Sequence, residues 1–483
     1  MAGTTNDGKM RDMAKFWLCV LSAVLLPACS QLRYQPVKTI GKVDLQQGYR
    51  LEKAFAEQRD SDDMFVVLMF SGGGTRAAAL GYGVLEELSK QQVYRNGRKY
   101  ALLDSVDIVY GVSGGSVLAA YFSLHGKKAI PRFEKYFLKQ NFQRQVSKQF
   151  FSLANLPRLT SPEFGRGDLL QEQFESALFK NATFGEMATR REGPFAVITA
   201  TDMTSGSRLE FTQEYFDAMC LNLSDMKIAR AVAASSAVPL LFAPLTLNNN
   251  GGNCGYTLPE GLNDAVNADD GKGSGLQQQT RQEIVSQRVN LYQDSKARPY
   301  IHLLDGGLTD NLGLRSLLDM TELYSGNMLY NQIRSDKVRK VVVINVNAQN
   351  QLVSDIDKSA DVPGFGSVAN AIINIPIDKY SQESLRRFRA FADQWNEDAK
   401  NGKNGHTVDM YFISLNLLDL PKSPLRDSVS NIATSFYLPS HEVNDLKQAA
   451  RELMANSAEY RRLLRDLSPP EKLSDGTRQN QLQ

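Results

Sequence analysis

The chain of 483 residues has little of several features that mark particular classes of protein. Its formal net charge is only +2, from 55 basic and 53 acidic side chains. A nucleic-acid-binding protein usually carries a clustered basic face, so we expect no nucleic-acid partner. With 42% hydrophobic residues and so little net charge, the chain is not a disordered protein. A mean hydropathy of −0.32 excludes a polytopic membrane protein.

Cysteine and histidine are also scarce, with four residues of each. No cysteine belongs to a CxxC pair or to a cluster with ligand spacing, and the acidic residues at 262–270 lack the EF-hand spacing. We therefore expect no bound metal and no cofactor. Cys220 and Cys254 would be able to form a disulfide in an exported protein or remain two free thiols, and the sequence leaves both open.

Long apolar runs are few, and one of them lies close to the N-terminus. Basic residues precede the run at 16–26, which is too short to cross ~30 Å of hydrocarbon and has the form of the apolar part of a secretory signal. The next residues, LPAC at 26–29, resemble the lipobox of a bacterial lipoprotein, in which the cysteine is acylated and becomes the mature N-terminus. We expect a signal peptide at 1–28 and lipidation of Cys29, with an ordinary secretory signal as the alternative.

The lipobox resemblance also implies a location. Ser30, rather than Asp, after the cysteine implies the outer membrane of a Gram-negative bacterium, with the protein facing the periplasm or the cell surface. Several acyl chains on one cysteine anchor a protein firmly, whereas a single chain is marginal. The membrane surface is therefore an expected partner. Either Met10 or Met13 would also serve as the start of translation.

Strands alternate with helices along the rest of the chain, which predicts an α/β fold with a mainly parallel central sheet flanked by helices. A continuous apolar run predicts a strand buried on both faces at 65–70, and further strands are predicted at 106–110, 195–200, 300–304 and 338–347.

The domain boundaries follow from changes in composition. Residues 248–296 are rich in Asn, Gly and Gln and have almost no apolar cluster, which is typical of a polar surface insertion. We expect a tether at 29–60, one catalytic domain at 61–470 that contains this insertion, and a flexible tail at 471–483. An amphipathic pattern predicts a helix at 384–395 within that domain.

The sequence Gly111-Val112-Ser113-Gly114-Gly115 is a G-x-S-x-G between a predicted strand and a predicted helix. In this context it predicts a nucleophile elbow, where Ser113 occupies a strained turn and Gly111 and Gly115 let strand and helix approach closely. The helix N-terminus also favours negative charge beside the serine. As a bare pattern it is common, and a glycine-rich turn without chemistry is the alternative.

A second glycine-rich turn, SGGGTR at 71–76, also follows a predicted strand. The backbone N–H groups of Gly72, Gly73 and Gly74 have no side chains in front of them, which suits an oxyanion hole or a phosphate cradle. The turn also fits the glycine pattern of a dinucleotide site. That site needs an acidic residue at the end of the next strand, which leads instead to Ser113.

The third motif, Asp305-Gly306-Gly307, follows the strand predicted at 300–304. An Asp at the carboxyl end of a parallel strand stands where open α/β sheets place their active sites. It would be able to accept the Ser113 proton directly. A Ser-Asp-His triad is the alternative, but none of the four histidines (His125, His302, His406 and His441) has a suggestive setting, so we favour a dyad.

Four motifs taken together resemble the patatin-like phospholipase family. They are the glycine-rich turn with Arg76, the G-x-S-x-G at 111–115, the sequence ASSAVP at 234–239, and the motif at 305–307, and they stand in the family's order. The resemblance implies a three-layer fold, a dyad of serine and aspartate, and an oxyanion hole in the glycine-rich turn. Arg76 would position that hole or bind phosphate. The turn departs from the family at its two ends, where Ser71 and Ala77 replace the usual Asp and Gly.

The function that follows from this resemblance is hydrolysis of fatty-acyl esters of phospholipids or related lipids. Ser113 and Asp305 would be the dyad, and the N–H groups of the glycine-rich turn and of Gly114 would hold the oxyanion. Two alternatives stay open. One is a soluble ester or thioester hydrolase with the same mechanism, and the other is an envelope lipoprotein that binds lipid without catalysis.

Overall fold

The computed structural model describes residues 36–468 except 60–62, 96–97, 153–154, 156–157, 159–160, 162–163, 268–274, 324–336, 351–357, 359 and 404–406. The predicted signal peptide at 1–28, the predicted lipidation site Cys29, His406 and the predicted tail at 471–483 therefore lie outside the described residues.

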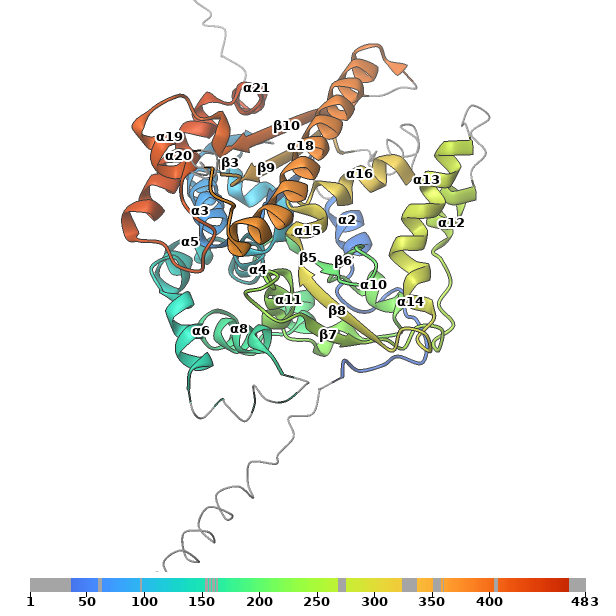
Figure 1. The fold of residues 1–483 in the computed structure, drawn as a ribbon. Coiled ribbons are helices and arrows are strands. Elements are labelled where there is room, and N and C mark those ends of the chain that lie inside the picture. The colour runs from blue at the N-terminus through green and yellow to red at the C-terminus, as the bar shows by residue number, and fades with distance from the viewer. Residues whose placement is uncertain are drawn as a thin grey trace, which may run out of the picture.

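An eight-stranded sheet forms the centre of the molecule, with the strand order β10-β9-β1-β4-β5-β8-β7 and with β6 also paired to β5 (Figure 1). Each neighbouring pair from β10 to β5 is parallel. These strands are β1 (Met64–Phe70), β4 (Val106–Val112), β5 (Phe195–Asp202), β9 (Lys340–Asn347) and β10 (Asp409–Asn416). Their apolar runs are buried almost throughout, and the predicted α/β fold with a mainly parallel sheet is confirmed.

The other strands are antiparallel to their neighbours and occupy the opposite edge of the sheet: β6 (Arg208–Glu210), β7 (Leu245–Asn248) and β8 (Tyr300–Asp305). The prediction that the strand before Asp305 is parallel was wrong. Exposed and buried residues alternate at the start of β8, as in an antiparallel strand with one solvated face, whereas β1 is buried on both faces.

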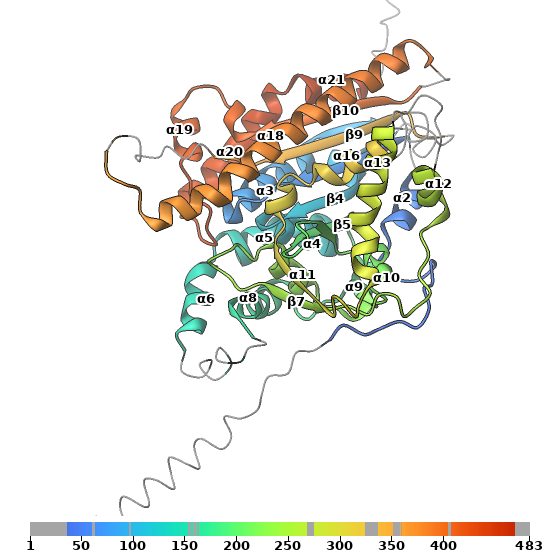
Figure 2. The same cartoon turned by 45° about the vertical axis from the view of Figure 1, so that its right-hand side comes forward.

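Helices cover both faces of the sheet. α3 (Gly74–Lys90) and α4 (Gly114–His125) follow β1 and β4, and α20 (Ser440–Asn456) packs on α3. α18 (Phe365–Lys400) connects β9 to β10 and crosses the other face (Figures 1 and 2). From β1 to β4 and β5 the chain moves along the sheet in one direction, and from β9 to β10 it moves in the other. Right-handed crossovers therefore place α3 and α4 on one face of the sheet and α18 on the opposite face.

The remaining described elements surround this core. They are α2 (Leu51–Arg59), the hairpin β2 (Gln92–Arg95) and β3 (Arg98–Ala101), α5 (Ala129–Phe133), α6 (Phe142–Phe150), α8 (Arg166–Phe174), α9 (Phe184–Arg190), α10 (Gln213–Ala218), α11 (Ile228–Ser235), α15 (Gly307–Asp310), α16 (Leu314–Leu323), α19 (Pro424–Ser430) and α21 (Ala458–Asp466). No helix in the described part of the chain is both long and apolar enough to cross a bilayer.

The segment 248–296 is more structured than its composition predicts. It contains α12 (Glu260–Asn267), α13 (Gly275–Val285) and α14 (Leu291–Gln293). A small apolar cluster joins this segment to Leu323 at the end of α16, and its members within the segment are Leu258, Leu262, Val266, Ile284 and Val285. A disulfide between Cys220 and Cys254 ties the start of this segment to the residues after α10.

Candidate active site

Ser113 and Asp305 come into direct contact from distant parts of the chain. The Ser113 hydroxyl donates a 2.7 Å hydrogen bond to Oδ2 of Asp305. The register of the strands explains why Ser113 and Asp305 are in contact. Val112 at the end of β4 lies opposite Thr199 of β5, and Asp305 at the end of β8 lies opposite Ala200, the next residue of β5. The two side chains therefore meet beside Thr199 and Ala200 of β5.

Ser113 occupies a sharp turn between β4 and α4. Its φ is +50°, an uncommon and strained value for a residue with a side chain. The glycines on either side of Ser113 allow the strands and the helix around this turn to approach one another closely. A Cβ on Gly111 would lie 2.6 Å from Cβ of Ala119, and a Cβ on Gly115 would lie 2.5 Å from the Phe70 carbonyl oxygen. The geometry is that of the predicted elbow.

The end of α11 holds both parts of the serine–aspartate pair. The Ser113 N–H donates to Oγ of Ser235 at 2.8 Å, and the Gly306 N–H donates to the Ser235 carbonyl oxygen at 3.1 Å. Two residues later, the Ala237 carbonyl oxygen accepts the Asp305 N–H at 3.0 Å. Ser235 belongs to one of the four sequence motifs, but this positioning role was not predicted. The Ser113 N–H therefore already has a hydrogen-bond acceptor within the protein.

The Asp305 carboxylate is buried and has two hydrogen-bond donors. Oδ2 accepts from Ser113, and Oδ1 accepts from the Gly307 N–H at 2.8 Å. Burial raises the pKa of Asp305 from its ordinary 3.8 to about 6, an effect that the hydrogen bonds from Ser113 and Gly307 oppose. A carboxyl group with this pKa is ionised near neutral pH and is a stronger base than an exposed one.

The histidines that the structure describes lie elsewhere. His302 is exposed on β8, with Nδ1 3.0 Å from Oγ1 of Thr246. His125 packs on the Tyr121 ring, and His441 is in the first turn of α20. Within the described residues, no histidine hydrogen-bonds to the Asp305 carboxylate.

The glycine-rich turn lies against the elbow, and its N–H groups differ in whether they already have a hydrogen-bond acceptor. The Gly72 N–H donates to the Asn311 carbonyl oxygen at 2.9 Å, so its assignment to the oxyanion hole is corrected because it already has an acceptor. Gly73 and Gly74 have φ values of +134° and +61°. In the described part of the chain, the N–H groups of Gly73, Gly74 and Gly114 have no hydrogen-bond acceptor.

Arg76 lies beneath this turn and is itself buried. Its Nε donates to the Ala348 carbonyl oxygen at 2.8 Å, and its Nη1 donates to that of Ile432 at 2.6 Å. A Cβ on Gly73 would lie 3.1 Å from its Nη2. Burial lowers the pKa of Arg76 to about 10, an effect that Asp378 of α18 opposes. Of the two predicted roles, this environment supports positioning of the turn, because the guanidinium bonds to backbone rather than facing solvent.

Asn311 is a residue of the site that was not predicted. Its carbonyl oxygen holds Gly72, and its Oδ1 stands 2.4 Å from the position of a Cβ on Gly72 and 3.0 Å from that of a Cβ on Gly307. The side chain therefore lies between the glycine-rich turn and the residues that follow Asp305. The only signal in the sequence is a polar residue shortly after the third motif.

A buried charge cluster fixes the helices that follow Asp305. The Arg208 guanidinium lies 3.1 Å from Glu210, 3.9 Å from Asp310 and 2.6 Å from Asp319. Burial raises the pKa of Asp310 to about 6, and Arg208 opposes this. Because Asp310 ends α15 and Asp319 is in α16, the cluster ties both helices to β6.

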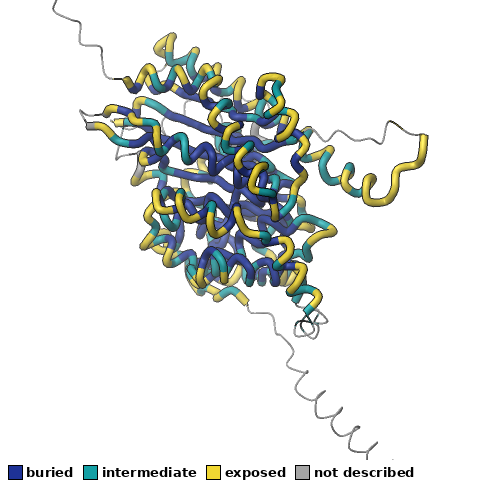
Figure 3. Tube along the Cα trace, turned by 90° about the vertical axis from the view of Figure 1, so that its left-hand side faces the viewer, coloured by how far each residue is buried: buried dark blue, intermediate teal, exposed yellow. Residues whose placement is uncertain are grey.

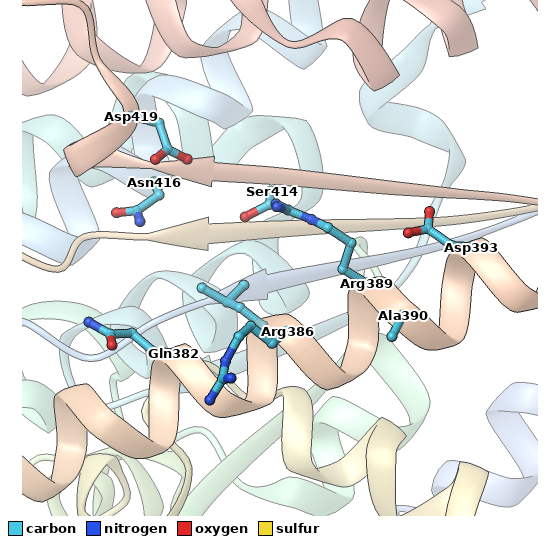
Figure 4. Close-up of a pocket in the computed structure, with 9 residues that line it drawn as sticks. Gln382, Arg386, Arg389, Ala390, Asp393, Ser414, Asn416 and Asp419 are labelled. Carbon is cyan, nitrogen blue, oxygen red and sulfur yellow. The ribbon is translucent and has the colours of Figure 1, made fainter.

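In the part of the chain that the structure describes, neither a metal-binding cluster nor the groove between α18 and β10 coincides with this site. In the described ranges, no group of three His, Cys, Asp or Glu side chains is arranged to hold a metal ion. A groove of about 500 Å³ lies between α18 and β10. Its lining residues include Arg386, Arg389, Asp393 and Asp419 (Figure 4). None of its lining residues belongs to the predicted site.

No curated protein matches the chain by sequence. Among solved structures, human GIVD cytosolic phospholipase A2 matches with 12% identity and a TM-score of 0.48, covering 90% of this chain and 68% of that one. VipD from Legionella pneumophila matches with 13% identity and a TM-score of 0.29, covering 91% and 72%.

The family comparison covers the region that contains all four motifs. The model of the patatin-like phospholipase family matches residues 68–318, which is just over half of the chain. The match begins in β1 and ends in α16, and β9 and β10 extend the same sheet beyond it by pairing with β1 and with each other. The chain belongs to the patatin-like phospholipase family.

Proposed function

We propose that the protein is a serine acyl hydrolase that cleaves fatty-acyl esters of phospholipids or related lipids. The observation that carries the proposal is the 2.7 Å hydrogen bond from the Ser113 hydroxyl to the buried Asp305 carboxylate. Family membership supports a lipid substrate. Unpaired N–H groups beside the serine support acyl transfer, because the tetrahedral intermediate of that reaction needs such donors.

The chemistry proceeds in two halves. Asp305 takes the proton from Ser113 as its Oγ attacks the ester carbonyl, and the N–H groups of Gly73, Gly74 and Gly114 hold the oxyanion. Asp305 then gives the proton to the leaving alcohol, which departs and leaves an acyl group on Ser113. A water molecule, deprotonated by Asp305, attacks the acyl-enzyme, and the fatty acid leaves as the proton returns to Ser113.

Product analysis tests this function. The mature protein is incubated with phospholipid vesicles and, separately, with a short-chain ester above and below its micellar concentration, and the products are identified by mass spectrometry. We expect free fatty acid and lysolipid from the wild type and none above background from Ser113→Ala. Turnover of monomeric esters alone would support a soluble ester or thioester hydrolase. A Ser113→Ala variant as active as the wild type would overturn the proposal.

We also propose that the protein is an exported lipoprotein, held by acylated Cys29 at the outer membrane of a Gram-negative bacterium. The signal-like segment at 1–28 and the sequence LPAC at 26–29 support this. The Cys220–Cys254 disulfide also supports export, because disulfides persist in oxidising compartments. Mass spectrometry of the mature N-terminus tests it: diacylglyceryl-modified Cys29 is expected, and an unmodified N-terminus after cleavage elsewhere would contradict it.

A further inference from the structure

The first half of α18 carries a row of exposed apolar side chains. Phe365, Val368, Ile372 and Ile375 are 82%, 45%, 68% and 58% exposed. Their spacing of three, four and three residues places them on one face of the helix. Figure 3 shows this half of α18 as an exposed segment that stands out from the body. We call these four side chains the apolar arm.

The arm also lacks charge. Residues 365–377 contain no Asp, Glu, Lys or Arg, and charged residues return at Asp378 and Lys379. Beyond that point the same helix is packed on the protein, with Ser381, Ser384 and Phe388 buried. Large exposed apolar patches on soluble proteins mark surfaces that bind another protein or a membrane.

The arm begins where α18 leaves the predicted active site. α18 contacts α15, which follows Asp305 directly, and Asp378 of α18 raises the pKa of Arg76 beneath the glycine-rich turn, against the effect of burial. From there the arm projects beyond the carboxyl ends of the parallel strands (Figure 2). Ser113 lies at these same strand ends, immediately after β4.

A second group of exposed apolar side chains follows a residue that contacts the site. Leu240 and Leu241 are 61% and 57% exposed, and Leu240 has a φ of +70°, which is strained for a leucine. They follow Ala237, whose carbonyl oxygen accepts the Asp305 N–H. We call this pair the leucine tip. It is held in place by Phe242, whose ring packs on Phe436 at 5.7 Å.

We propose that the apolar arm and the leucine tip insert into a lipid bilayer and so place the ester carbonyls of bilayer lipids at Ser113. This inference rests on the proposed function and adds the surface by which the substrate is reached. An uncharged arm needs no anionic lipid, so zwitterionic phosphatidylcholine suffices and binding depends little on salt. A second copy of the chain is a poorer occupant, because the row covers fewer than two heptads before Pro376 whereas coiled coils sustain three or four.

Insertion is measured at the residue that inserts. Phe365→Trp is made in the full chain carrying Ser113→Ala, and its fluorescence is recorded with vesicles of brominated phosphatidylcholine. The matched control is Leu45→Trp, because Leu45 is also exposed, at 59%, but belongs to a different part of the protein. It is four residues from Tyr49, whose ring stacks on Phe195 at the start of β5 and not on the residues of β5 beside Ser113. We expect a shift to shorter wavelength and quenching for Phe365→Trp only. Absence of quenching at position 365 would overturn the proposal, whatever anchors the protein to the vesicle.

Activity provides the second measurement. The double variant Phe365→Glu/Ile372→Glu is expected to lower the ratio of vesicle hydrolysis to hydrolysis of a monomeric ester by about tenfold, and Leu45→Glu is expected to leave it unchanged. If the wild type releases no fatty acid, the proposed function fails, but the quenching result still decides the lipid surface. A dimeric wild type that becomes monomeric in the double variant, without quenching at position 365, would identify a second copy as the occupant and overturn the proposal.

Discussion

A side chain on Gly114 would begin 2.0 Å from the carbonyl oxygen of Gly74. The first residue of α4 and the first residue of α3 are therefore in backbone contact, and this contact sets the glycine-rich turn against the nucleophile elbow. This approach of two helix N-termini builds the proposed oxyanion site and also favours negative charge there.

Gly114→Ala tests this contact. Because the new methyl group meets backbone atoms that cannot rotate away, we expect at least a hundredfold loss of kcat/KM on a monomeric ester and a loss of about 1–3 kcal/mol in the free energy of unfolding. Gly261→Ala is the matched control, since a Cβ there has no atom within 4 Å and Gly261 is also in the first turn of a helix. Equal activity of the two variants would show that the turn and the elbow are not in contact.

Ser235→Ala tests the support of the nucleophile. The change leaves the buried Ser113 N–H without its acceptor, which costs about 1–3 kcal/mol and releases a strained turn. We expect kcat to fall by at least tenfold with little change in KM, because Ser235 does not touch the substrate. Steady-state kinetics measure this split, and Ser235→Thr, which keeps the hydroxyl, is expected to recover part of kcat. A change confined to KM would contradict the assignment.

The pH profile follows from the raised pKa of Asp305. Only the carboxylate accepts the Ser113 proton, so kcat/KM is expected to fall tenfold per pH unit below about 6 and to level off above it. His302→Ala and His441→Ala are expected to keep the same profile. A midpoint that moves in either variant would indicate that a histidine participates.

Stability has the opposite dependence on pH. The pKa of Asp305 is about 6 in the folded protein and ordinarily 3.8, so the folded state holds this proton more tightly and loses stability as pH rises from about 4 to 6. Asp305→Asn removes that cost. We expect the variant to be more stable than the wild type at pH 8 by up to about 3 kcal/mol, with the difference vanishing towards pH 4. Urea unfolding at both pH values measures this, and a less stable variant at pH 8 would contradict it.

The Cys220–Cys254 disulfide closes a loop with a sequence separation of 34. Because a cross-link of this kind restricts the unfolded chain, Cys220→Ser/Cys254→Ser is expected to lose about 2–4 kcal/mol in the free energy of unfolding. The disulfide joins the residues after α10 to the insertion rather than to Ser113. Activity at low temperature should therefore remain near the wild-type value, and its loss in the folded variant would show that the insertion supports the site.

Much of the centre of this fold could be predicted from the sequence, because each parallel strand is an apolar run that ends in glycine or a polar turn. β1 and β4 were placed to within two residues. The direction of β8 was predicted wrongly, because a six-residue segment that ends in aspartate is compatible with either orientation. Only the pairing of β8 with β5 and β7 determines its direction. The helix predicted at 384–395 extends to Phe365, because Pro376 and Gly366 interrupt the pattern but not the helix.

The side chains with chemistry were easier to predict than the groups that hold them. Ser113 and Asp305 stand in short motifs with a mechanism. The roles of Ser235 and Asn311, and the loss of Gly72 as a donor, depend on contacts between segments more than 100 residues apart. Local sequence carries no information on which of three neighbouring N–H groups already has an acceptor.

The central claim is that Asp305 activates Ser113 as a nucleophile, and covalent trapping tests it most directly. The folded protein is treated with an alkyl fluorophosphonate, and the modified residue and the rate of modification are determined by peptide mass spectrometry. The account predicts one adduct on Ser113, formed at least a hundredfold more slowly in Asp305→Asn and at the wild-type rate in His302→Ala. An unmodified Ser113 in the folded protein, or an Asp305→Asn variant that reacts as fast as the wild type, would contradict it.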